Sequence, residues 1–138
     1  MKIKMHKKKS QPRNYIIKPE KVKSLPYHDI ERMESEIGPL YKFVDPQKVA
    51  GADVTILVRK VEREISARKK IGASVHKHSF DQLYCILGDL SVEIFMNGKR
   101  KTIQGPASVF LPAGLDHAID FVGGKGYAVN ILFTKKYE

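Results

Sequence analysis

Apolar residues follow two different periodicities along this chain. In the N-terminal third, Ile30, Met33 and Ile37 recur at helical spacing, so they would share one face of a helix. Asp29 stands where an N-cap residue is expected, and Gly38 with the following proline stands where a helix would end. The pattern therefore predicts one short N-terminal helix.

From about residue 53 onward the pattern changes to that of strands. Short apolar runs such as DVTILVRKVE, QLYCIL and GYAVNILF are separated by turn residues about every 8–12 positions. Asn97-Gly98, between SVEIFM and KRKTI, is the strongest short hairpin signal. We therefore predict an all-β antiparallel barrel or sandwich with its core strands at about 53–134. The segment NYIIK is a candidate edge strand.

The charge is distributed unevenly along the 138 residues, a length typical of one domain. Residues 1–24 hold nine Lys and Arg and one acid, Glu20, whereas residues 25–138 hold 16 basic and 14 acidic side chains. This predicts a basic, flexible arm at 1–24 and a single β-barrel domain at 25–138. The lysine run has no interleaved aromatic residue, so we expect no specific nucleic-acid partner. Weak, salt-sensitive binding to polyanions is the alternative.

Hydropathy and cysteine content bear on location. No apolar run approaches the roughly 18 residues of a membrane helix, and the basic N-terminus lacks the apolar segment of a secretory signal. Cys85 is the single cysteine, so an internal disulfide is impossible. The sequence thus predicts a cytoplasmic protein with no membrane partner.

The chain contains histidines in a pattern that suggests a metal site. His76 and His78 alternate as on a strand, so both would project to the same side, and Gln82 begins the next apolar run. His117 follows a tight Pro-Ala-Gly turn far along the chain. Imidazoles buried in a β interior are costly unless satisfied, and neutral imidazole is the commonest metal ligand. The alternative is that His76 and His78 are surface residues flanking Lys77.

These residues also carry a family resemblance. HKHSFDQLYCILGDL, followed by GPASVFLPAGLDH, resembles the two motifs of the cupin superfamily, as found in small single-domain cupins. The resemblance implies a cupin-type antiparallel β-barrel or jelly roll, and it makes His76, His78 and His117 ligands of one divalent transition metal (Fe, Mn, Ni, Zn or Cu). Gln82 stands where the family usually has glutamate, and Phe121 replaces a common asparagine.

The glutamine in the expected donor set affects the expected chemistry. Without a carboxylate ligand, a divalent ion keeps its full charge, acts as a stronger Lewis acid and favours anionic, chelating substrates. Cupins with a similar set include enzymes that linearise unsaturated uronates, and others with three histidines are oxygenases. We therefore expect a metal-dependent enzyme for a small keto acid, β-dicarbonyl or sugar acid, acting by dioxygenation or by isomerisation. The alternative is a non-catalytic sensor or storage barrel.

Strand parity suggests further residues of the pocket. Tyr84, two residues after the predicted glutamine ligand, is a candidate acid/base or orienting group, with plain core packing as the alternative. Ile119 and Phe121 follow the third histidine on one face and would form an apolar wall. Asn130, inside the apolar run AVNILF, would be a pocket hydrogen-bonder or an edge residue facing water. His28, on the predicted helix, is expected to be solvated.

The outward face of QLYCIL is apolar as well. Leu83, Cys85 and Leu87 alternate with the predicted inward residues, whereas a solvated sheet should be polar on that side. This predicts a cover, either the N-terminal segment or a second copy of the chain. With the resemblance to cupins, a homodimer formed by sheet packing is the expectation.

Overall fold

The computed structural model describes residues 16–26, 28–64, 71–72 and 74–137. In chain order, the elements are β1 (Glu20–Lys21), α1 (Ile30–Glu36), β2 (Leu40–Val44), β3 (Thr55–Val61), β4 (Ile71–Gly72), β5 (Gln82–Gly88), β6 (Ser91–Met96), β7 (Lys99–Gln104), β8 (Ala107–Leu111), β9 (His117–Gly123) and β10 (Gly126–Leu132). The described chain is therefore mostly β, as the sequence predicted.

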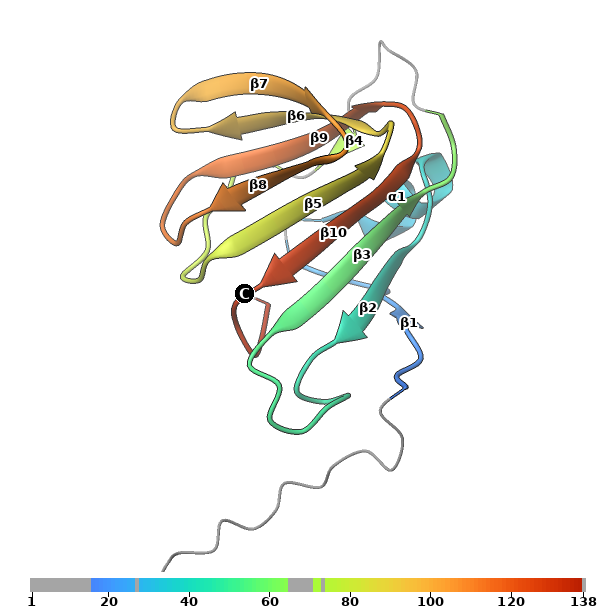
Figure 1. Cartoon of the computed structure of the whole chain (residues 1–138), viewed down its shortest axis with the longest axis vertical. Coiled ribbons are helices and arrows are strands. Elements are labelled where there is room, and N and C mark those ends of the chain that lie inside the picture. The colour runs from blue at the N-terminus through green and yellow to red at the C-terminus, as the bar shows by residue number, and fades with distance from the viewer. Residues whose placement is uncertain (1–15, 27, 65–70, 73, 138) are drawn as a thin grey trace, which may run out of the picture.

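The strands form two antiparallel sheets that face each other (Figure 1). One has six strands in the order β1-β2-β3-β10-β5-β8, and the other has four in the order β4-β9-β6-β7. Strands that follow one another in the chain, such as β7 and β8 or β9 and β10, lie in different sheets. The chain thus crosses repeatedly between the layers, which is the arrangement of a jelly roll.

The predicted hairpin is present between β6 and β7. Met96 pairs with Lys99, which leaves Asn97 and Gly98 as a two-residue turn. Their φ angles are 52° and 73°, the left-handed region that such a turn requires at both positions and that Asn-Gly tolerates best. A local rule therefore determined this part of the fold.

The edge strands differ from the sequence prediction. Ile16–Lys18, the described part of NYIIK, is not a strand, and β1 and β2 occupy the edge of the larger sheet instead. Residues 1–15 of the predicted arm lie outside the described residues. The segment SVHKHSF is not a regular strand either. It makes only an isolated bridge between His76 and His117, and the chain bends at Ser79 and Phe80 before β5 begins.

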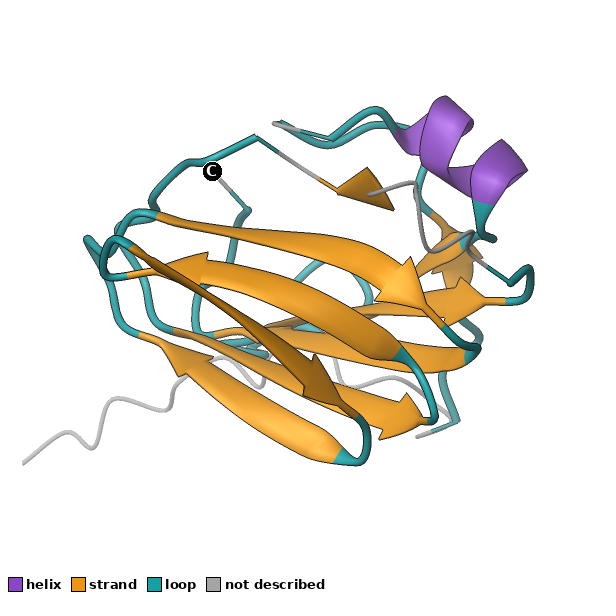
Figure 2. Cartoon of the chain, turned by 90° about the horizontal axis from the view of Figure 1, so that it is seen from above, coloured by secondary structure: helices purple, strands orange, loops and turns teal. Residues whose placement is uncertain are grey.

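Helix α1 lies outside the two sheets, at one end of the sandwich (Figure 2). Its N-cap is Asp29, whose side chain accepts a hydrogen bond from the Arg32 backbone N–H at 3.2 Å. Ile30 and Met33 are buried against the barrel. It has seven residues, and none of the described residues forms a helix long and apolar enough to cross a membrane.

The core fills the space between the two sheets. Its most deeply buried members come from both layers and include Ile86, Leu111 and Val92. A second buried cluster lies toward α1 and contains Ile30, Leu40, Leu57, Phe80 and Leu132. Phe80 follows two residues after His78 and stacks on its ring, so this second cluster packs against the histidine segment.

Candidate metal centre

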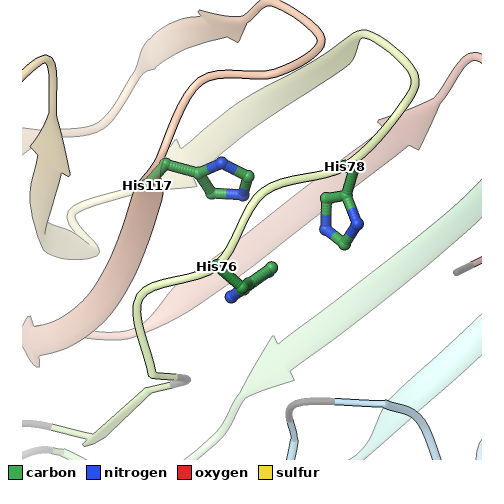
Figure 3. A group of neighbouring side chains, drawn as sticks. All are labelled: His76, His78 and His117. Carbon is green, nitrogen blue, oxygen red and sulfur yellow. The ribbon is translucent and has the colours of Figure 1, made fainter.

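Two segments distant in the chain bring His76, His78 and His117 together. The backbones of His76 and His117 exchange two hydrogen bonds, of 3.0 Å and 2.9 Å, which join the segment before β5 to the start of β9. The Gly114 N–H donates to the His78 carbonyl at 2.8 Å, so the turn before β9 holds the second histidine as well. Figure 3 shows the three rings facing a common space.

The geometry of the three rings suits one metal ion. A ligand nitrogen from each histidine lies within 4.8 Å of the others. Nitrogens bound to one ion at about 2.1 Å lie roughly 3–4 Å apart, so small ring rotations suffice. His78 and His117 are 5% and 4% exposed, and His76 is partly buried. The alternative interpretation, in which both His76 and His78 lie on the surface, therefore does not hold for the buried His78.

Backbone carbonyls set the tautomers of two of these histidines. His76 Nδ1 lies 2.6 Å from the carbonyl oxygen of Ser74, and His117 Nδ1 lies 3.0 Å from that of Leu115. A carbonyl only accepts, so each Nδ1 must carry the proton and each lone pair is on Nε2. Proteins commonly orient metal-binding imidazoles in this way.

Burial also favours the metal-binding form of His117, one of the three candidate ligands. Burial is the largest influence on His117 and lowers the pKa of its imidazole, which the hydrogen bond to the Leu115 carbonyl partly offsets. The neutral ring, which binds metals, is therefore favoured at neutral pH.

Gln82 provides an oxygen in the same interior. It is the first residue of β5 and is 2% exposed, and its Nε2 donates to Asn130 Oδ1 at 3.0 Å. Asn130 Nδ2 in turn donates to the Tyr84 hydroxyl at 3.1 Å. The buried Gln82 Oε1 accepts no hydrogen bond from the part of the chain that the structure describes. The donor set thus fits a metal, and Gln82 as its fourth ligand stays a prediction.

Sequence reasoning missed three side chains around the cluster. The His28 ring lies 6.0 Å from that of His76 between centroids, and its Nε2 is 3.0 Å from the Tyr137 hydroxyl. Tyr137 also contacts His78 edge-on at 5.0 Å, and Phe80 stacks on His78 at 4.7 Å. The expectation that His28 is solvated was wrong, because the segment before α1 folds over the site. Of these three side chains, only Phe80 lies close to the cluster in sequence, two residues after His78, so only it could have been found from the sequence.

Comparisons with known proteins identify the fold. No family model and no curated protein matches the chain. Among solved structures, an RmlC-like cupin from Shewanella frigidimarina is 15% identical, with a TM-score of 0.54 over 72% of this chain and 78% of that one. KdgF from Halomonas sp. is 13% identical, with a TM-score of 0.58 over 80% and 89% of the two chains. The chain has the cupin fold. EutQ from Clostridium difficile, 9% identical with a TM-score of 0.51 over 75% of this chain and 80% of that one, is also similar in structure.

The interior of the barrel contains a small cavity that His28, the ring neighbour of His76, lines, whereas none of the three clustered histidines does. Its volume is about 40 Å³, and all four residues expected in the pocket line it: Tyr84, Ile119, Phe121 and Asn130. Burial raises the pKa of Tyr84 to about 12, so its phenol stays protonated at neutral pH. Ile119 and Phe121 also belong to the apolar core between the sheets.

A wider cleft of about 800 Å³ is lined by residues of the N-terminal segment and of the chain's C-terminal end. None of the three clustered histidines lines it, but Tyr137, which packs on His78, does. Its charged lining is mainly basic, with Glu20 and Asp45 as acids and the following lysines: Lys21, Lys23, Lys42, Lys135 and Lys136. The cleft that shares Tyr137 with the histidine cluster therefore has a lining that is positively charged overall.

Proposed function

We propose that this cupin is a metal-dependent enzyme acting on a small anionic or enolisable compound. The observation that carries the proposal is the convergence of three imidazoles whose ligand nitrogens lie within 4.8 Å of one another. In His76 and His117 the Nδ1 proton is directed to a backbone carbonyl. This arrangement leaves Nε2 of each ring to bind the metal. A structural role alone does not require three convergent imidazoles.

The proposed ligands are His76, His78, His117 and the Gln82 Oε1 atom. A divalent transition metal bound there, whether Fe, Mn, Ni, Zn or Cu, would polarise a carbonyl or enol oxygen as a Lewis acid. All four donors are neutral, so they leave a cationic site for an anionic substrate. Tyr84, held by Asn130 and protonated at neutral pH, would donate a hydrogen bond to the substrate and orient it.

The substrate class follows from charge. The mainly basic cleft beside Tyr137 and the neutral donor set both favour a keto acid, a β-dicarbonyl enolate or a sugar acid. Dioxygenation and isomerisation or enolisation are the two reaction types that this set of groups serves. A non-catalytic sensor or storage barrel is the second candidate, because a small cavity with convergent polar groups also suits simple binding.

Elemental analysis of untagged protein tests the proposed metal. The wild type should contain nearly one equivalent of a transition metal per chain, and a His76→Ala/His78→Ala variant should contain none. Lys77→Ala is the matched control, because Lys77 is exposed between the two histidines and should leave the metal content unchanged. If the wild type stays metal-free after incubation with Fe, Mn, Ni and Zn, the proposal is wrong.

Substrate screening separates the enzyme from the binding barrel. The metal-loaded protein would be offered keto acids, β-diketones and unsaturated uronates, with oxygen consumption and product formation followed separately. Turnover of any of these supports the enzyme, and the oxygen balance distinguishes dioxygenation from isomerisation. A tight ligand that is never converted favours the sensor or storage protein.

The outer face of the larger sheet supports the proposed homodimer. Phe110 pairs in register with Leu83, and Tyr127 with Leu87, so their side chains share this face. Leu87, Phe110 and Tyr127 are 44%, 52% and 44% exposed, so none of the described segments covers them. An apolar sheet face of this kind suits packing against a second copy of the chain.

A further inference from the structure

Arg59 has a buried positive charge, and none of the described residues pairs with it as an acid. It lies in β3 with its side chain toward the interior and is only 4% exposed. Its Nη1 donates to the Gly38 carbonyl at 3.0 Å, and its Nη2 is 3.7 Å from the Met33 sulfur. These contacts hold the guanidinium in place, but neither partner bears a negative charge.

The surroundings show that this charge persists. Burial lowers the pKa of Arg59 to about 10, so the guanidinium is still protonated at neutral pH. The acidic residue that influences it is Glu34, and Glu34 forms its ion pair with Lys21 on the outside of α1. A buried charge with no counterion is costly to a fold, so its presence calls for a reason.

The small interior cavity provides that reason. Arg59 lines it together with Tyr84, Asn130 and His28. The Tyr84 oxygen accepts its hydrogen bond from Asn130 Nδ2, and its own proton meets no acceptor among the described residues. The cavity therefore offers a cation and a hydroxyl donor but no acid. A volume of about 40 Å³ holds roughly three waters, which is also the space of a carboxylate group.

Two contacts connect the cavity to the candidate metal centre. Asn130, in the cavity wall, accepts a hydrogen bond from Gln82, and His28, in the same wall, contacts His76. We propose that Arg59 and the Tyr84 hydroxyl form a carboxylate-binding subsite, which anchors one end of the substrate while its other end lies at the three histidines. The role in substrate binding rests on the proposed function, whereas the anion subsite itself does not require a metal.

The test measures anion binding to the full-length protein after removal of metal with EDTA. Acetate and acetamide are compared as additives at constant ionic strength, because they have the same shape and differ in charge. Acetate should raise the melting temperature of the wild type by several degrees, and acetamide should not. Arg59→Met should abolish the acetate effect, and Arg59→Lys should weaken it, since lysine lacks the planar fork that pairs with both oxygens.

Further controls separate a binding role from a structural one. Lys60→Met removes the next cation along β3, whose side chain is 45% exposed, and should leave the acetate effect intact. Without acetate, Arg59→Met should melt at or above the wild-type temperature, because it removes an uncompensated buried charge. Equal effects of acetate and acetamide on the wild type would overturn the subsite, even if no Arg59 variant folds.

The two proposals can fail independently. An acetate effect that depends on Arg59, in a protein that never takes up metal, would keep the subsite and end the metal-dependent function. Full metal content with equal effects of acetate and acetamide would keep the metal-dependent function and exclude the subsite. Arg59→Met should bind metal as the wild type does, because Arg59 is not among the proposed ligands.

Discussion

The stability of the metal-free protein should fall on acidification because of His28. Burial is the largest cause that lowers the pKa of this imidazole, followed by the neighbouring His76 and Arg59, and together they bring it from 6.5 to about 4. The folded state therefore holds His28 neutral, while the unfolded state protonates it near pH 6.5. Its contribution is complete above pH 6.5 and is lost as the pH falls toward 4.

The size of the effect follows from the two pKa values. With 6.5 in the unfolded state and about 4 in the folded state, linkage gives a loss in the free energy of unfolding of about 2 kcal/mol at pH 5. The loss reaches about 3 kcal/mol at pH 4 by the same relation. This is a large part of the roughly 5–15 kcal/mol that stabilises an ordinary domain.

The assay is urea unfolding of EDTA-treated protein at several pH values between 7 and 4. A His28→Gln variant is the reference, because glutamine can still bond the Tyr137 hydroxyl and does not titrate. His117 and the carboxylates titrate in both proteins, so the difference between the two curves isolates His28. The wild type should lose about 3 kcal/mol more than the variant between pH 7 and 4. Parallel curves would refute the reasoning.

Two further predictions concern the proposed fourth ligand and the dimer. Gln82→Leu should weaken metal binding about tenfold or more in a chelator competition, while Gln82→Glu should strengthen it by adding a negative charge. Unchanged affinity in both would show that Gln82 does not bind the ion. Phe110→Lys should convert a dimer to a monomer in light scattering, because it places a charge on the exposed apolar face, whereas Lys101→Glu on β7 should not. A monomeric wild type would exclude the homodimer.

Local rules explain which parts of the fold were predictable. The Asn97-Gly98 turn and the strand alternation around Tyr84 depend on neighbouring residues alone, so the sequence was sufficient for them. The spacing of the histidines and the resemblance to the cupin motifs predicted the cluster that the structure brings together. The edge strands β1 and β2 depend on long-range pairing with β3, and no local pattern encodes that choice.

The residues that sequence reasoning missed share one physical cause. Strand β3 is buried on both faces, so its composition does not reveal that Arg59 points inward. His28 reaches the cluster only because the segment before α1 folds over the barrel, a contact between residues 48 positions apart. Such contacts depend on tertiary packing, which periodicity along the chain does not report.

The acceptors that orient His76 and His117 are main-chain oxygens of residues two positions earlier. Many metal sites depend for this purpose on carboxylate side chains, which a single substitution can delete. Here every amino acid at positions 74 and 115 supplies the same oxygen. A substitution at either position therefore leaves the acceptor in place, so a search for relatives should weight the histidines above the side chains two positions before them.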